Sequence, residues 1–261
     1  MSMLNNITNI TKRRTFRSFK DEELRGEVLD ELSDFLSSLC MPFDGIDWNF
    51  DTLPYMDLMR ISMRGPGVKA PHYLLLRAEK KAYSLQNSGY LGEMAALWLT
   101  GQGIGSCWQG GVAISPHEDF PDSLPYVSTL AFGMSDEPFR ADASEAQRQP
   151  LDSIAFGQIE PHRPLLEAAR LAPSYFNRQK IRFVCDDRGD IHIYRKKVML
   201  NNPVFSYQDC VSAGASMAHL QTAADALGLP NRFAILKPSP GFKRYLYQAT
   251  LKLGSNAAEN A

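Results

Sequence analysis

Apolar residues recur along the chain at two spacings, one typical of helices and the other of strands. Segments 89–105 and 212–228 are apolar at helical spacing on nearly every face, and each ends on a glycine. This pattern predicts two long helices that are buried rather than exposed, each closed by its glycine. Shorter amphipathic helices are predicted over 29–36 and 166–173.

Alternating positions predict strands over 125–133 and 246–254, and 72–78 and 181–187 are two further strand candidates. Each half of the chain then has the order helix, strand, long helix, strand. This order predicts an α+β fold: a mostly antiparallel central sheet with helices packed on both sides and the two long helices in the core.

The two halves also match in sequence. When the long helices are aligned on their last glycines, Met94 matches Met217, Ala95 matches Ala218 and Leu97 matches Leu220; in the strands that follow, at an offset two residues smaller, Tyr126 matches Tyr247 and Thr129 matches Thr250. Repeated elements in one order indicate an internal duplication. We expect a first half over 1–135 and a second half over 156–261, joined by the polar, proline-containing connection 136–155.

Three arginines lie close together in "RRTFRSF", residues 13–19, ahead of the first amphipathic helix. If this segment is extended, Arg13, Thr15 and Arg17 share one face. Two guanidinium groups with a hydroxyl between them suit a phosphate. The alternative is a solvated basic face before a helix.

Composition removes several classes of function. The 261 residues are 44% hydrophobic with a formal net charge of -1, which does not favour a nucleic-acid-binding protein. No apolar run approaches the roughly 20 residues of a membrane helix, and no secretory signal is recognisable. The four cysteines and five histidines lack metal-ligand spacing. Unpaired cysteines fit a reduced compartment, so we expect a cytoplasmic protein without a bound metal.

Glycines in "GQGIGS", residues 101–106, superficially match a dinucleotide-binding loop. Such a loop follows a strand and precedes a helix. Here the segment follows a predicted helix, so we interpret it as a helix end and a sharp turn.

Five segments together resemble the nitroreductase family of FMN-dependent oxidoreductases. They are "RRTFRSF", "APHYLLL", "GIGSCWQGG", "LAFGMSDEPFRADASEAQRQPLD" and "LEAARLAPSYFNRQKIRFV". Typical members are homodimers that bind FMN across the subunit interface. Here the arginine motif and the P-S-x-x-N-x-Q motif lie in different halves, so the chain resembles a long single-chain branch built as a fused pseudo-dimer.

The resemblance implies roles for individual residues, none of them catalytic. Arg13, Thr15 and Arg17 would hold the FMN phosphate and ribityl chain, with Arg14 and Arg148 adding positive charge. Trp108, Gln109, Gly110 and Gly111 would lie along the isoalloxazine ring. The other half of the fused pair would contribute Pro173, Ser174, Tyr175 and Asn177, with Gln179 completing the motif. Lys180 departs from the proline that is usual there.

The resemblance also implies the chemistry: hydride passes from NAD(P)H to flavin N5, and then to a small nitroaromatic or quinone-like acceptor at the same ring face. We expect one FMN in each chain, because each half has kept only one part of a site. Two alternatives stay open. The chain could store flavin without turnover, or it could be a flavin-fragmenting or dehalogenating relative with the same fold.

Overall fold

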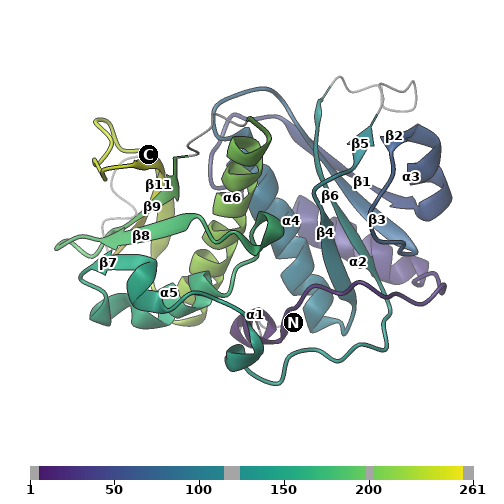
Figure 1. Ribbon diagram of the computed structural model, residues 1–261, viewed down its shortest axis with the longest axis horizontal. Helices are drawn as coiled ribbons and strands as arrows, with labels where there is room; N and C mark the ends of the chain where they lie inside the picture. The colour runs from purple at the N-terminus through teal and green to yellow at the C-terminus, as the bar shows by residue number, and fades with distance from the viewer. Residues whose placement is uncertain (1–5, 115–123, 198–202, 255–261) are drawn as a thin grey trace.

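Two mostly antiparallel sheets lie on either side of a pair of long helices, α4 (Ser84–Gly101) and α6 (Pro203–Ala226) (Figure 1). This computed structural model describes residues 6–114, 124–197 and 203–254. The α+β class with antiparallel sheets and packed helices is confirmed. The expected sheet is divided in two, one part in each half of the chain.

The first half forms a four-stranded sheet in the order β1-β3-β6-β4, in which every neighbouring pair is antiparallel. A two-stranded ribbon, β2-β5, lies apart from it. Besides α4, the elements are α1 (Asn6–Lys12), α2 (Gly26–Ser37), β1 (Trp48–Pro54), α3 (Tyr55–Ile61), β2 (Ser62–Arg64), β3 (His72–Ala78), β4 (Gly105–Gln109), β5 (Ala113–Ile114) and β6 (Tyr126–Gly133).

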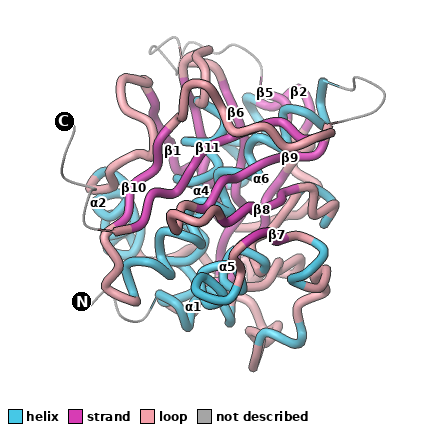
Figure 2. The backbone as a smooth tube through the Cα atoms, turned by 90° about the vertical axis from the view of Figure 1, so that its left-hand side faces the viewer, coloured by secondary structure: helices cyan, strands magenta, loops and turns pink. Residues whose placement is uncertain are grey.

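The second half forms a five-stranded sheet in the order β10-β11-β9-β8-β7, which faces the viewer in Figure 2. Only the β7-β8 pair is parallel. Besides α6, the elements are the 3-10 turns Ala143–Glu145, Leu151–Ser153, Glu160–His162 and Tyr175–Asn177, helix α5 (Arg163–Arg170), and strands β7 (Ala155–Gly157), β8 (Ile181–Cys185), β9 (Ile191–Lys196), β10 (Asn231–Ala234) and β11 (Tyr245–Leu253).

The internal duplication is visible in the sheet order, since β8-β9-β11-β10 repeats β1-β3-β6-β4. A hydrogen bond repeats as well. The Tyr126 and Thr129 hydroxyls lie 2.9 Å apart on β6, and those of Tyr247 and Thr250 lie 2.6 Å apart on β11. The sequence match between these two strands is therefore supported.

The predicted pairing of 72–78 with 181–187 is wrong. Residues 72–78 form β3, whose counterpart in the second sheet is β9, whereas β8 corresponds to β1. The two main sheets thus contain strands that were not predicted: β1 and β4 in the first half, and β7, β9 and β10 in the second. Strand β1 is half-exposed with a polar middle.

The register predicted for the long helices is also wrong, by two residues. Helix α4 closes at Gly103, with φ +74°, and not at Gly105, which begins β4. Helix α6 closes at Gly228, with φ +66°. In both caps the amide after the glycine reaches back into the last turn: Ile104 donates to the Leu99 carbonyl at 2.9 Å, and Leu229 donates to Ala224 at 2.9 Å. Gly103 therefore corresponds to Gly228, and Met94 does not correspond to Met217.

Helices α4 and α6 cross with their backbones in direct contact. A Cβ placed on Gly89 would clash with the Val211 carbonyl, and one placed on Gly214 would clash with the Gln86 carbonyl. In the corrected register Gly89 matches Gly214 and Gln86 matches Val211. The crossing thus has the reciprocal contacts of a two-fold interface, within one chain.

None of the described helices is both long enough and apolar enough to cross a membrane.

Candidate functional site

The N-terminal arm runs beside β4 in extended form. Thr15 bridges Ser106 in parallel, and the Phe16 amide donates to the Ser106 carbonyl at 3.0 Å. Phe16 is buried against Gly105, where a Cβ would approach its ring to 2.7 Å. A glycine is therefore required at the start of β4 for the arm to lie flat against the sheet.

Arg13 does not share the surroundings of Arg17. Its guanidinium is buried and forms an ion pair with Glu93 of α4 at 2.8 Å, whereas Arg17 is exposed. The fully buried Glu93 carboxylate also accepts from His219 Nε2 of α6 and from Trp108 Nε1 of β4, both at 2.9 Å. Burial acts to raise the pKa of Glu93, but the Arg13 charge and these two donors hold it below its usual value.

Arg14 has partners on the connection between the halves. Its guanidinium donates to Glu137 Oε2 at 3.2 Å and to the Pro138 carbonyl at 3.0 Å. Glu137 Oε1 accepts the backbone amides of Arg17 at 3.0 Å and Ser18 at 2.9 Å. This carboxylate fixes the end of the arm onto the connection.

Arg148 links the connection to the second half. It donates to Asn177 Oδ1 and to the Leu171 carbonyl, both at 3.0 Å, while its Nε is buried without a partner among the described residues. Burial, with the neighbouring charges of Arg13 and Arg140, lowers the pKa of Arg148 to about 10.

Arg140 was not singled out in the sequence, yet it belongs to the same group. Its Nη1 is buried and has no hydrogen-bond partner in the described parts of the chain. Burial, and then the charges of Arg13 and Arg14, lower its pKa to about 10. We call these four residues, Arg13, Arg14, Arg140 and Arg148, the arginine cluster. The available signal was a second arginine in the segment "EPFRADASEAQRQPL".

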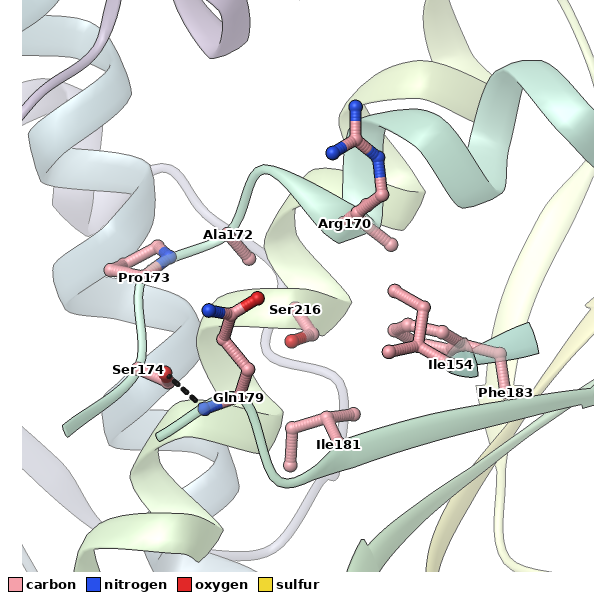
Figure 3. A pocket seen from close by; sticks show the side chains of 10 residues that line it. Ile154, Arg170, Ala172, Pro173, Ser174, Gln179, Ile181, Phe183 and Ser216 are labelled. Carbon is pink, nitrogen blue, oxygen red and sulfur yellow. Dashed lines mark hydrogen bonds between the residues drawn. The ribbon is translucent and has the colours of Figure 1, made fainter. Parts of the chain in front are cut away.

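The facing loop, residues 173–179, is held from both sides. The Gln179 amide donates to Ser174 Oγ at 2.8 Å (Figure 3), and Gln179 Oε1 accepts the Gln149 amide at 2.7 Å. The loop has positive φ at three residues other than glycine: Phe176, Asn177 and Gln179. Such strain is concentrated at functional sites, where the surroundings impose it.

The β4 turn, residues 108–111, meets the facing loop at one point. A Cβ on Gly110 would overlap the Tyr175 ring, so this ring lies directly on the Gly110 backbone. Trp108 packs against Gly92 of α4, and Gln109 is buried, with its Oε1 accepting the Val68 amide at 3.1 Å. A Cβ on Gly111 would meet open space. Gly111 is therefore the part of this turn that a further flat ring can approach, because the Tyr175 ring already covers Gly110.

A small cavity lies beneath the facing loop, lined by Arg170, Pro173, Ser174, Gln179, Ser216 and apolar side chains (Figure 3). Its volume is about 20 Å³. A space of this size holds a water molecule and is far smaller than a cofactor pocket. This cavity is not a flavin site.

Comparison with known proteins places these features in a family. A family model described as "Putative TM nitroreductase" matches residues 5–224. The crystal structure of a "putative nitroreductase" from Thermotoga maritima is 22% identical, covers 96% of this chain and 93% of its own, and has a TM-score of 0.62. At this identity the likeness concerns the fold alone.

Shorter solved structures match part of the chain. A nitroreductase family protein from Clostridium difficile is 19% identical and covers 59% of this chain and 96% of its own, with a TM-score of 0.45. A nitroreductase with bound FMN from Bacteroides fragilis is 14% identical and covers 52% and 89%, with a TM-score of 0.39. No curated protein matches the chain.

Proposed function

We propose an activity for this chain from the premise that it belongs to the nitroreductase family whose model matches residues 5–224. Membership indicates a flavin-dependent oxidoreductase. We infer that the flavin is FMN, that NAD(P)H supplies the hydride, and that the acceptor is a small nitroaromatic or quinone-like molecule taking its turn at the same ring face.

The arginine cluster supports FMN rather than a flavin without phosphate. Arg140 Nη1 and Arg148 Nε are buried donors without partners among the described residues, and buried polar groups are rarely left unpaired. A phosphate would satisfy them and relieve the repulsion among four guanidinium groups. Thr15 and Arg17, on the same arm, would complete the phosphate and ribityl contacts.

The β4 turn and the facing loop support the position of the ring. Gly111 lets a planar group approach the backbone, and Tyr175, packed on the neighbouring Gly110, supplies an aromatic edge from the other half. FMN, when bound, supplies the hydride-accepting ring nitrogen. The protein's own residues orient the ring and provide positive charge, so we assign no catalytic side chain.

The observation that carries the proposal is the contact of the β4 turn and the connection with the facing loop within one chain. Arg148 of the connection donates to Asn177, and Gly110 of the first half lies against Tyr175 of the second, which supports a single site built from both halves. We infer that this site needs no partner chain.

The test compares FMN with riboflavin, which lacks the phosphate, in the native chain and in Arg140→Gln. We expect the native chain to prefer FMN. Arg140→Gln should weaken FMN about tenfold and leave riboflavin unchanged, since a charge-assisted hydrogen bond contributes about 1.5–3 kcal/mol. Without flavin the variant should be at least as stable as the native chain, because an unpaired buried charge is removed.

The matched control is Arg188→Gln, at an exposed arginine in the turn between β8 and β9. It should change neither affinity. Equal affinity of the native chain for both flavins would refute the phosphate assignment.

A second measurement separates an enzyme from a storage protein. Anaerobic addition of NADH or NADPH should bleach the flavin bound to an enzyme, whereas a storage protein would leave the flavin absorbance unchanged.

A further inference from the structure

A second group of cations lies at the other side of the facing loop. Strand β8 begins at Ile181, opposite Arg195 near the end of β9. The Lys196 amide donates to the Lys180 carbonyl at 2.9 Å. This strand pairing brings Lys180 and Arg195 to one end of the sheet, next to Arg178 of the loop.

These three cations surround one carboxylate. Asp209 of α6 is buried, and Arg178 Nη2 lies 3.4 Å from its Oδ2. Burial raises the pKa of Asp209, although the charges of Arg178, Arg195 and Lys180 oppose this rise. We call Arg178, Lys180, Arg195 and Asp209 the Asp209 cluster. With one negative charge against three positive ones, it carries an excess of positive charge.

Three guanidinium nitrogens of this cluster are buried without a hydrogen-bond partner among the described residues: Arg178 Nη1 and both Nε and Nη1 of Arg195. Arg195 also lies near Cys210, where its charge and a hydrogen bond oppose the rise that burial causes in the pKa of that thiol. Burial and the neighbouring Lys196 and Arg178 charges lower the pKa of Lys180. Unpaired donors and uncompensated charge together are what an oxyanion would satisfy.

The cluster is separate from the arginine cluster but close to the proposed ring. Asn177 contacts Arg148, whereas the next residue, Arg178, lies over the Phe205 ring at 4.1 Å. The Phe205 and Tyr175 ring centroids are 6.2 Å apart, and Tyr175 rests on Gly110. The rings of Phe205 and Tyr175 would lie between a ligand held here and the β4 turn.

We propose that Arg178, Lys180 and Arg195 bind an oxyanion carried by a substrate that reaches the flavin ring. The oxyanion is a phosphate of the nicotinamide donor or a carboxylate of the acceptor. The inference rests on the proposed function for the position of the ring, but the charge and the unpaired donors are properties of the chain itself. Lys180, which departs from the family motif, gains a role here.

The test is calorimetric titration of the FMN-saturated protein with two anions and their neutral counterparts. The donor arm uses 2′,5′-ADP against adenosine, and the acceptor arm uses 4-nitrobenzoate against 4-nitrobenzamide. We expect one anion to bind at least about tenfold more tightly than its neutral counterpart, the gain of one charge-assisted contact. The arm that shows the preference identifies the source of the oxyanion.

Two variants should shift this preference in opposite directions. Arg195→Gln keeps the Arg178–Asp209 ion pair and should lose about tenfold in anion affinity. Asp209→Asn removes the competing carboxylate and should bind the anion more tightly, a gain that a merely structural role would not produce. Arg188→Gln, at the opposite end of β8 and β9, should leave both affinities unchanged.

Equal binding of anion and neutral probe in both arms would overturn the inference, and so would an anion preference that survives Arg195→Gln. Flavin content and reduction by NAD(P)H are recorded on the same preparation. A flavin that binds and is reduced without any anion preference refutes this inference alone. An anion preference in a chain that binds no flavin supports the anion site and refutes the proposed function.

Discussion

Glu93 is a single carboxylate that holds donors from three parts of the chain: the arm, β4 and α6. Its third donor, His219, has both ring nitrogens engaged, Nε2 with Glu93 and Nδ1 with the Ala168 carbonyl at 2.8 Å. Both ring nitrogens of His219 therefore lie within hydrogen-bond distance of an oxygen, and the Arg13 guanidinium places a positive charge against the buried carboxylate.

Glu93→Gln should destabilise the protein strongly. The amide cannot compensate the buried Arg13 charge, and removing one partner of a buried ion pair costs about 3–5 kcal/mol. The measurement is the free energy of unfolding from urea titration. Glu31→Gln, at an exposed glutamate of α2, is the control and should change it by less than about 0.5 kcal/mol. Equal stability of the Glu93 variant and the native chain would contradict this account.

The same pair of proteins gives a pH test. The pKa of Glu93 is lowered on folding from its ordinary value of 4.5. The contribution of Glu93 to the free energy of unfolding is therefore fully present above pH 4.5. It is lost as the pH falls through the pKa that Glu93 has in the folded protein. The stability difference between native chain and Glu93→Gln should narrow only below pH 4.5. A difference that narrows at higher pH would mean that another group is responsible.

At the scale of elements, the crossing of α4 and α6 determines how the two halves meet. Gly89 and Gly214 bring the helix backbones together, and the Gln86 side chain donates to Gln248 Oε1 of β11 at 2.9 Å across the same interface. Side chains at these two glycines would separate the helices. The β4 turn and the facing loop, which belong to different halves, would then move apart.

Gly89→Ala tests this crossing. Alanine favours an isolated helix by about 1 kcal/mol over glycine, but here its Cβ would clash with the Val211 backbone, which cannot move aside as a side chain can. Overpacking costs about 1–3 kcal/mol or more, so we expect a net loss in the free energy of unfolding. Gly26→Ala, at the first residue of α2 and in open space, should be neutral or stabilising. A stabilised Gly89 variant would show that the helices do not cross in contact.

At the scale of the whole molecule, the duplicated fold has two related positions, the proposed flavin site and its counterpart, and they differ. The Tyr175 amide donates to Ser212 Oγ of α6 at 3.2 Å, and in the related position the Phe43 amide donates to Asn87 Oδ1 of α4 at 3.1 Å. Phe43 thus stands where Tyr175 does. Gly110 corresponds to Ile235, since the preceding residues Gln109 and Ala234 pair with Thr129 and Thr250.

In this second place the glycine surface is lost. Phe43 and Ile235 both pack against the core of the second half. A ring cannot approach the backbone there, and the second half has no arginine motif before α5.

We therefore predict one FMN per chain, bound by the monomer. Flavin released by acid from a saturated sample, divided by protein, should give about one, the value for a single site built from both halves. Size-exclusion chromatography at dilution should keep flavin with the monomer. A ratio of two would show that the second place still binds. A ratio of one-half, with flavin lost on dilution, would place the site between chains.

The sequence alone determined the class of fold, the two long buried helices and the strands at 72–78, 125–133, 181–187 and 246–254, although β8 and β11 differ slightly at their ends. These features depend on local periodicity, which a chain displays whatever its partners are. Strand β1 was missed because half-exposed strands with polar centres lack that signal. The helix register was two residues off because small residues repeat along both helices, and the alignments are distinguished by the caps at Gly103 and Gly228 and by the backbone contacts at Gly89 and Gly214.

The surroundings of the site residues were decided by tertiary structure. Arg13 and Arg17 lie four positions apart in one motif, yet one is buried against Glu93 and the other is exposed. Arg140 and the Asp209 cluster could not be identified as candidate binding residues from the sequence. They stand out only in the fold, where strands and loops from distant segments bring like charges together. The physical reason is that charge pairing depends on distance and burial in space. The distance between two charges and their burial depend on residues that are far apart in the chain. A local sequence pattern therefore does not contain this information.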